Sequence, residues 1–339
     1  MVSEKMELSA KKTVQEVYVS YQSSNKLRQS LSQFRFREDI EWLEVREWLG
    51  DLVKQALDDD IVDTIREFKE DDDLCALVIR GLPVDYELCA TPYTGYVDLT
   101  AISLSIAINI GIYQLSGFYP VAYEHENDGR LFRHVVPAEN ALYEKSSHGS
   151  IYTFGHHVDN PDLPLACENI TALSGCPELL SLLALRSDLG VRSNFILVDD
   201  LLSQLCNGVI SELCESNFLI NRLDSFGQPR SSRLPVLVKR DDGVIFCRYD
   251  KENTTPLTER AAAALVMLEA QLQNEKLKQY MVYQPGDLLM IKNQRLLHSR
   301  EGFLSRSDGA DRWLVRLFGI SSLDRIVPVS EQLPHIGKD

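Results

Sequence analysis

Three residues, His157, Asp159 and His298, have side chains that could bind a redox-active metal. Two imidazoles and one carboxylate can hold one face of an iron(II) ion, which leaves three coordination positions open for substrate and oxygen. The first two residues lie two positions apart, whereas His298 lies far downstream. If the fold brings them together, the sequence predicts an oxygenase in which all three are metal ligands and catalytic residues.

The His-x-Asp pattern at 157–159 is weak by itself, because acidic residues are common in this chain, with 50 Asp and Glu among 339 residues. Its context strengthens it. Residues 151–155 have the pattern of a strand, and alternate side chains of a strand point to the same face. His157 and Asp159 would therefore face one ion together, while His156 would face away as a packing residue.

Two arginines, Arg312 and Arg316, follow His298 on another predicted strand. Side chains four positions apart on a strand share a face, so both guanidinium groups are expected to point into the same interior. Each needs an anionic partner, because an unpaired buried charge is costly. A ligand carboxylate bound through two hydrogen bonds would serve. The alternative is ion pairing with internal acids such as Asp287 or Asp311.

The composition is that of an ordinary globular protein, with 44% hydrophobic and 25% charged residues. The net charge of −15 would repel a phosphate backbone, so nucleic acid is not expected as a partner. Residues 1–12 lack the apolar core of a signal peptide, and the long uncharged stretch 99–121 is too polar for a convincing membrane span. The seven cysteines are scattered without a metal-binding spacing, so a cytoplasmic location is expected.

Hydrophobic periodicity predicts an α+β chain whose N-terminal part is charged and helical. A buried strand is expected at 74–83 and a buried helix at 98–114. Further strands are predicted at 131–136, 150–158, 179–186, 194–198, 244–249, 288–291 and 313–320, and a long helix at 258–280. Helices before the strands and among them suggest a sandwich or jelly roll with helical additions. The predicted organisation is a helical extension at 1–73 packed on a main domain at 74–339, with lid insertions at 123–150 and 205–235.

Residues 286–300 and 308–316 together resemble the C-terminal signature of the clavaminate synthase-like iron(II)/2-oxoglutarate dioxygenases, which belong to the taurine dioxygenase superfamily. The strand at 77–83 and the Val-Val-Pro segment at 135–137 fit the same pattern. The resemblance covers residues from about 74 to 320, and the C-terminal motif is its most specific part. It implies a double-stranded β-helix core, that is, a cupin-like jelly roll, with flanking and inserted helices.

The resemblance also implies that Fe(II), 2-oxoglutarate and O2 are bound together. Iron would be held by His157, Asp159 and His298, and Arg312 would pair with the distal carboxylate of 2-oxoglutarate. Ser193 lies near the place where the family often puts a hydroxyl on this cosubstrate. The family couples decarboxylation of the keto acid to hydroxylation of an unactivated C–H bond, and the same reaction is expected here.

Residues for the substrate follow from the same resemblance. Arg316 would face its α-carboxylate, and Ser146 and Ser147 match a serine pair that lines the substrate pocket in amino-acid hydroxylases of the family. Asp250 falls where related enzymes place acids for a cationic side chain, although a residue that follows a strand fits a turn equally well. We therefore expect hydroxylation of a free amino acid, and specifically of one with a lysine- or arginine-like side chain.

One position departs from the amino-acid hydroxylases, most of which carry Glu where this chain has Asp159, while the wider superfamily mostly carries Asp. A shorter carboxylate moves the metal, so the substrate does not transfer directly from that subgroup. Three alternatives stay open: the same chemistry on a sulfonate, phosphonate or carrier-bound residue, a zinc hydrolase with the same three ligands, and a non-catalytic jelly-roll binding module. The oligomeric state is not predicted.

Overall fold

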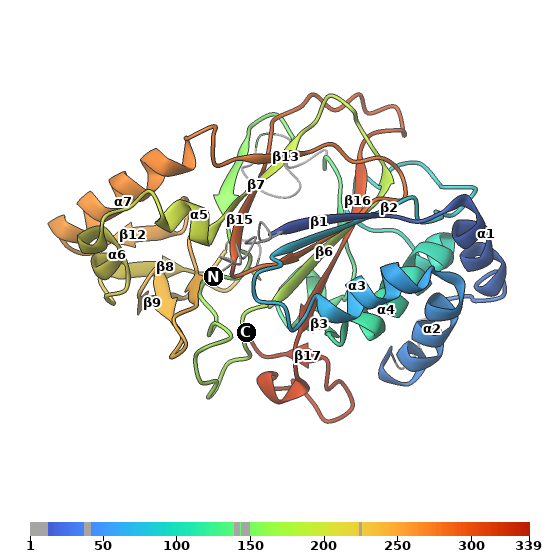
Figure 1. Cartoon of the computed structure of the whole chain (residues 1–339), viewed down its shortest axis with the longest axis horizontal. Coiled ribbons are helices and arrows are strands. Elements are labelled where there is room, and N and C mark those ends of the chain that lie inside the picture. The colour runs from blue at the N-terminus through green and yellow to red at the C-terminus, as the bar shows by residue number, and fades with distance from the viewer. Residues whose placement is uncertain (1–12, 37–41, 139–142, 144–149, 224–225) are drawn as a thin grey trace, which may run out of the picture.

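The structure of the chain, a computed structural model, describes residues 13–36, 42–138, 143, 150–223 and 226–339 (Figure 1). Its centre is a pair of β-sheets built from distant parts of the chain. The larger sheet has the order β1 (Val14–Tyr18), β2 (Ala76–Arg80), β14 (Leu288–Lys292), β6 (Leu179–Arg186), β16 (Trp313–Ile320), β3 (Tyr119–Tyr123) and β17 (Ile336–Gly337), and β4 (Arg133–Val135) also pairs with β16. The smaller sheet has the order β13 (Gln279–Met281), β7 (Ser193–Leu197), β15 (Leu296–Arg300) and β5 (Phe154–His157).

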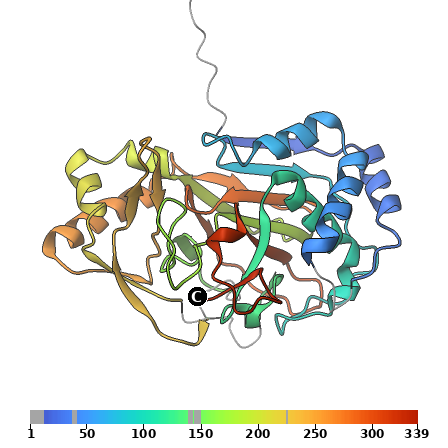
Figure 2. The ribbon, with the colours of Figure 1, turned by 90° about the horizontal axis from the view of Figure 1, so that it is seen from below.

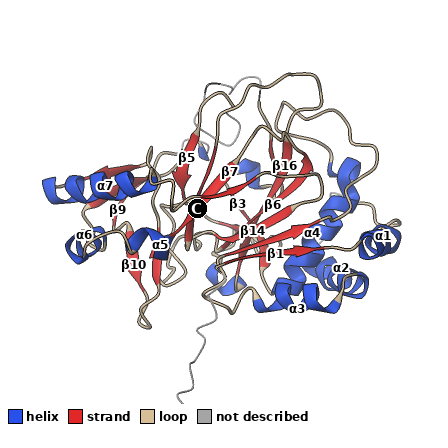
Figure 3. Ribbon diagram, turned by 45° about the horizontal axis from the view of Figure 1, so that its top comes forward, coloured by secondary structure: helices blue, strands red, loops and turns tan. Residues whose placement is uncertain are grey.

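Helices lie in two groups, one on each side of the sheets (Figures 2 and 3). The first group, on the right of Figure 1, comprises α1 (Tyr21–Ser30), α2 (Trp42–Ala56), α3 (Asp59–Glu67), η1 (Leu99–Ile102) and α4 (Ser103–Ser116). The second group, on the left, forms a lobe of α5 (Val198–Leu202), α6 (Asn207–Leu213), α7 (Glu259–Leu272), β8 (Phe218–Asn221), β9 (Ser231–Leu234) and β12 (Thr254–Pro256), next to the strand pair β10 (Leu237–Lys239) and β11 (Ile245–Cys247). The short helices η2 (Asn127–Gly129) and η4 (Leu323–Arg325) complete the described chain.

Alternation along β16 explains why its sequence is almost uniformly apolar. Leu314 and Phe318 belong to the core shared by the two sheets, whereas Val315 and Leu317 belong to the core between the larger sheet and the first group of helices. Both faces of the larger sheet are therefore buried, which favours uninterrupted apolar runs over strict alternation with polar residues. Arg316 lies on the same side as Leu314 and Phe318, and it lines the cavity between the sheets.

The segment Leu99–Ser116 is long and apolar enough to cross a membrane by length and composition, but most of it is buried inside the protein. Its helix α4 packs against α2, and Gly111 makes this contact close. A Cβ atom at Gly111 would lie 2.5 Å from Val53 Cγ2 and 2.8 Å from the Leu49 carbonyl oxygen. Only a residue without a side chain fits at this position, because protein interiors are close-packed.

The predicted α+β architecture is confirmed, and the strands predicted at 179–186 and 313–320 have the bounds of β6 and β16. The N-terminal part differs from the prediction, because it is not only helical. Its strand β1 pairs in parallel with β2, with Val14 opposite Ala76. β1 is the outermost strand of the sheet. Its polar residues Gln15 and Glu16 therefore gave no strand-like apolar pattern.

The helix predicted at 258–280 ends at Leu272, and residues 279–281 form strand β13 against β7. Asn274 provides the reason: its side chain accepts a hydrogen bond from the Lys276 N–H at 3.2 Å, which favours a turn over further helix. The two predicted lid insertions contain regular structure, namely η2 and β4 in the first and α6, β8 and β9 in the second. Their closure over a site stays a prediction, as does the domain boundary after residue 73.

Candidate metal centre

The three predicted ligands meet where β5 and β15 lie side by side in the smaller sheet. His157 and His298 are cross-strand partners, and their ring centroids are 4.2 Å apart. Asp159 follows β5, and its Oδ2 lies 3.4 Å from His298 Nε2. One ligand atom from each side chain lies within 4.8 Å of the other two. Pairing in the β-ladder thus brings His298 to the other two ligands, as the oxygenase prediction requires.

The surroundings of these side chains fit a divalent metal ion. His157 Nδ1 donates to the Gly155 carbonyl oxygen at 2.8 Å, which leaves Nε2 free to bind a metal and fixes the orientation of the ring. Asp159 Oδ2 is buried and has no hydrogen-bond partner among the described residues. A carboxylate oxygen in this state, beside two imidazoles, suits iron(II), which two histidines and one carboxylate commonly bind.

Burial and nearby charges set the protonation of the ligands in favour of metal binding. Burial, together with the neighbouring His298, lowers the pKa of His157 to about 3. For Asp159, burial alone would raise the pKa, but the interactions with His298 and Arg316 outweigh burial and lower it below its usual value. Both groups are therefore deprotonated at neutral pH, so a metal ion that binds there displaces no proton from either.

His156 points away from the metal ligands, as predicted. Its Nε2 lies 2.6 Å from the Oδ1 of Asn194 on β7, and the ring is buried. Burial lowers the pKa of His156 to about 4. The residue is therefore a neutral packing side chain at physiological pH.

We expect acid to destabilise the metal-free protein partly through His156. Its folded-state pKa of about 4 lies below the ordinary value of 6.5, so the unfolded state binds more protons between these pH values. The stability that the neutral ring contributes is complete above about pH 6.5 and is lost as the pH falls toward 4, by up to about 1.4 kcal/mol per pH unit. Urea unfolding between about pH 4.5 and 6.5 should show a weaker pH dependence for His156→Gln than for the wild type. Equal slopes for the two proteins would contradict this assignment.

Arg312 and Ser193 line the same cavity as the three ligands. Arg312 donates from Nη2 to Ser193 Oγ at 3.3 Å, and its guanidinium lies over the Tyr283 ring, 5.5 Å from the centroid. Burial lowers the pKa of Arg312. Among the described residues, no carboxylate lies within ion-pair distance of Arg312. The two acids named as alternative partners bind elsewhere: Asp287 pairs with Arg80, and Asp311 accepts from Tyr93 and Ser305. A buried cation without an internal anion is arranged to receive an anionic ligand.

Arg316 is arranged differently, because internal acids already surround it. Its guanidinium binds the carboxylate of Glu126, and its Nη1 lies 3.6 Å from Asp159 Oδ1. Glu126 also accepts from Arg133 Nη1 at 3.0 Å, and all four side chains are buried. The sequence analysis missed Glu126, because a single acidic residue before β4 belongs to no motif. Only its pairing with Arg316 in the fold identifies it.

The structure does not place the other predicted substrate residues, Asp250, Ser146 and Ser147, in the metal cavity. Asp250 forms an isolated β-bridge with His157 and is buried. Its Oδ1 accepts from two backbone N–H groups of the following turn, at 2.8 and 3.3 Å, so the residue does cap a turn. It is not among the described residues that line the metal cavity, and its contact with a substrate stays a prediction. Ser146 and Ser147 lie outside the described residues.

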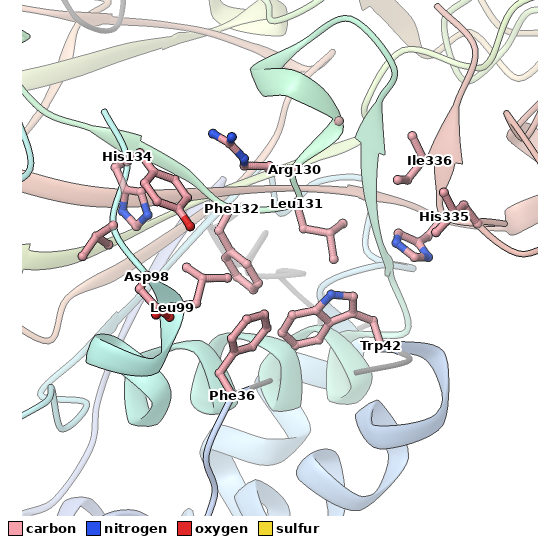
Figure 4. A pocket seen from close by; sticks show the side chains of 14 residues that line it. Phe36, Trp42, Asp98, Leu99, Arg130, Leu131, Phe132, His134, His335 and Ile336 are labelled. Carbon is pink, nitrogen blue, oxygen red and sulfur yellow. The ribbon is translucent and has the colours of Figure 1, made fainter. Parts of the chain in front are cut away.

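A separate hollow of about 360 Å³ lies on the other side of β4, where Phe36, Trp42 and Phe132 converge (Figure 4). Successive residues of β4 point to opposite sides, so His134 lines this hollow whereas Val135 lines the metal cavity. None of the predicted site residues within the described chain lines the hollow. The predicted chemistry therefore belongs to the cavity that contains the three predicted ligands and both arginines.

Comparisons with known proteins agree with this site. Residues 192–318 match the family described as "Taurine catabolism dioxygenase TauD, TfdA family". The chain is 30% identical over 300 residues to L-asparagine oxygenase from Streptomyces coelicolor. The aligned region covers 85% of this chain and 83% of that protein. It is 26% identical over 257 residues to L-lysine 3-hydroxylase from Catenulispora acidiphila, with coverage of 74% and 68%. The fold matches a crystal structure of asparagine oxygenase in complex with Fe(II), 2S,3S-3-hydroxyasparagine and succinate, with a TM-score of 0.82, 25% identity and coverage of 96% and 99%.

Two sheets that enclose a cluster of two histidines and one carboxylate define a double-stranded β-helix oxygenase. The chain belongs to the TauD/TfdA family of Fe(II)/2-oxoglutarate-dependent oxygenases, where it is related to clavaminate synthase and to amino-acid hydroxylases. The predicted fold and the predicted use of Fe(II) and 2-oxoglutarate are confirmed. Family membership sets aside the zinc-hydrolase and binding-module alternatives.

Proposed function

We propose that the protein hydroxylates an unactivated C–H bond of a free amino acid, with iron held by His157, Asp159 and His298. When bound, iron and 2-oxoglutarate supply the oxidising chemistry, and the protein supplies binding and orientation. One observation carries the proposal: a buried pair of opposite charges, Arg316 and Glu126, lies beside the metal ligand Asp159.

This charge pair matches the two charges of an amino acid. Arg316 can bind an α-carboxylate through two hydrogen bonds, and Glu126 can accept hydrogen bonds from an α-ammonium group. Because a zwitterion brings one charge of each sign, it can exchange partners with Arg316 and with Glu126, which keeps its bond to Arg133, without leaving a buried charge alone. A sulfonate or phosphonate without an ammonium group would bring only negative charge toward Glu126 and Asp159. A sulfonate or phosphonate of this kind therefore fits the charge pair less well than a free amino acid.

The other residues of the cavity would orient the cosubstrate and exclude water. Arg312 and Ser193 would receive the distal carboxylate of 2-oxoglutarate. Apolar side chains from β6, β14 and β16 line the same cavity and would keep water from the reacting groups. The substrate carbon that oxidation reaches would be the one that Arg316 and Glu126 hold nearest to the metal.

We further propose that the side chain of the substrate is basic, lysine- or arginine-like. Asp250 supports this, because it lies next to His157 and because burial raises its pKa, so that a nearby cation would favour its charged form. The acidic net charge of −15 favours the approach of a cation. One relative is an L-lysine 3-hydroxylase and another an L-asparagine oxygenase, so a substrate panel has to include both kinds of side chain.

The panel measures succinate formation with L-lysine, L-arginine and L-ornithine against L-asparagine, L-glutamine and L-norleucine. N-acetylated forms of the same amino acids serve as controls without the ammonium charge, and taurine as a control in which a sulfonate replaces the α-carboxylate while both charges remain. We expect free basic amino acids to give the fastest turnover. Faster turnover with taurine would refute the amino-acid proposal, and so would activity confined to the N-acetylated substrates, since these lack the ammonium group that Glu126 is proposed to bind.

Glu126→Gln tests the charge pair directly. The amide keeps the size of the carboxylate but loses its charge, so the KM for the preferred amino acid should rise about 10- to 100-fold. The KM for 2-oxoglutarate should change little, because Arg312 does not contact Glu126. Steady-state kinetics in each of the two substrates checks both values, and an unchanged KM for the amino acid would contradict the assigned role.

A further inference from the structure

Asp159 is the one metal ligand that no β-ladder holds. His157 is paired with His298, and His298 is paired in addition with Phe195 on the other side of β15. β5 ends at His157. The next residue after Asp159, Asn160, has a left-handed backbone with φ of 52°. The chain thus turns away immediately after the carboxylate ligand, and the backbone of Asp159 needs another anchor.

That anchor is the side chain of Asn293. Its Oδ1 accepts from the Asp159 N–H at 3.0 Å, and its Nδ2 donates to the Asp159 carbonyl oxygen at 3.1 Å. One carboxamide therefore satisfies both backbone polar groups of Asp159, as a neighbouring strand would. Nδ2 also donates to the Pro177 carbonyl oxygen at 2.9 Å, and Asn293 is completely buried.

Asn293 is itself held firmly, and it lies close in sequence to another ligand. It occupies the turn between β14 and β15, the turn that leads the chain from the larger sheet to the smaller one. Its N–H donates to the Glu178 carbonyl oxygen at 3.0 Å. His298 follows on β15. The position of Asp159 relative to His298 is therefore fixed by a short, well-anchored stretch of chain.

We infer that Asn293 is a positioning residue that sets the place of the Asp159 carboxylate against the two histidines, and with it the affinity for iron. The inference rests on the iron site of the proposed function and goes beyond it, since it names what determines metal binding. Groups that hold metal ligands in place commonly change metal affinity about 10- to 100-fold when they are removed. A buried carboxamide is hard to replace here, because an unmet backbone N–H would be left at Asp159, and its carbonyl oxygen would keep only the weak donor Cys176 Sγ, at 3.3 Å.

The neighbouring residue Gln294 offers a matched control. It is another buried carboxamide in the same turn, and it binds the chain between β5 and β6, which also contains Asp159. Its Oε1 accepts from the Ala166 N–H at 2.8 Å, and its Nε2 donates to the Cys176 and Pro177 carbonyl oxygens at 3.1 and 3.2 Å. It makes no hydrogen bond to Asp159. Gln294→Ala and Asn293→Ala should therefore lower the free energy of unfolding in urea by similar amounts. Only Asn293→Ala should displace the metal ligand Asp159.

The experiment measures the affinity of the metal-free protein for Fe(II), under anaerobic conditions, and for Co(II) by calorimetry. We expect Asn293→Ala to raise the Kd about 10- to 100-fold and Gln294→Ala to leave it nearly unchanged. At saturating Co(II), the visible bands, which report coordination geometry, should shift in the first variant only. Asn293→Ser, whose hydroxyl cannot reach both backbone groups, takes the place of the alanine variant if that variant does not fold.

Three outcomes separate the possibilities. Wild-type affinity and an unshifted Co(II) spectrum in a folded Asn293 variant would overturn the inference. Equal losses in the Asn293 and Gln294 variants would also overturn it, because they would show a general loss of packing. Failure of the wild-type protein to bind either metal would instead contradict the iron site on which the inference rests.

Discussion

Replacement of Arg312 by methionine should weaken 2-oxoglutarate binding roughly 30- to 5,000-fold. Arg312 is buried and has no carboxylate partner among the described residues, so the distal carboxylate of the cosubstrate would be its missing anion. Removal of one member of a buried charge pair commonly costs about 2–5 kcal/mol of binding free energy, which corresponds to this range of affinity. An anaerobic titration of the Fe(II) protein, followed by the weak visible absorption of the iron–keto acid chelate, measures the change.

The stability of the protein without 2-oxoglutarate, in contrast, should not fall when methionine replaces Arg312. Without 2-oxoglutarate, Arg312 is a buried charge whose described polar contact is with Ser193, so methionine should leave the free energy of unfolding unchanged or raise it. Arg186→Met is a suitable control, because Arg186 makes hydrogen bonds to the carbonyl oxygens of Leu88 and Cys89 and does not line the cavity. That variant should lose stability and keep its affinity for 2-oxoglutarate. Wild-type affinity in the Arg312 variant would mean that another group binds the distal carboxylate.

The parts of the fold that the sequence predicted well are those whose burial is uniform. β6 and β16 are covered on both faces, so their apolar runs end where the sheet ends. β1 could not be found in this way, because an edge strand is held by backbone hydrogen bonds to β2, a partner far along the chain. Local pattern also failed at Asn274, where one side-chain hydrogen bond ends a helix that hydrophobic periodicity would have continued.

In the site, too, residues in a short motif could be predicted from the sequence, whereas residues defined by contacts with distant parts of the chain could not. His157 and Asp159 could be predicted because their side-chain types and spacing on a strand suit one metal ion. Glu126 and Asn293 could not, since an isolated Glu or Asn has no distinctive pattern and acquires a role only through partners elsewhere in the chain. Arg316 was expected to face a ligand, but only the fold shows that its guanidinium also lies beside the carboxylates of Glu126 and Asp159.

Removal of one metal ligand should abolish both metal binding and turnover. His298→Ala leaves two protein ligands, so succinate formation should fall by roughly three orders of magnitude, because the metal supplies the reaction chemistry. A bound metal also stabilises the folded state: at 100 times its Kd it adds about 2.7 kcal/mol to the free energy of unfolding. Urea unfolding with and without Fe(II) under anaerobic conditions should show this increment in the wild type and none in the variant.

His156→Gln is the control that distinguishes loss of a ligand from damage to the strand. His156 is adjacent to His157, but it points to Asn194 on the other side of the smaller sheet. If the metal is bound by His157, Asp159 and His298, the His156 variant keeps the stabilisation by Fe(II) and the His298 variant loses it. If both variants keep the stabilisation by Fe(II), the ion binds elsewhere. The pairing of β5 with β15, which brings His298 to His157, would then not create the metal site.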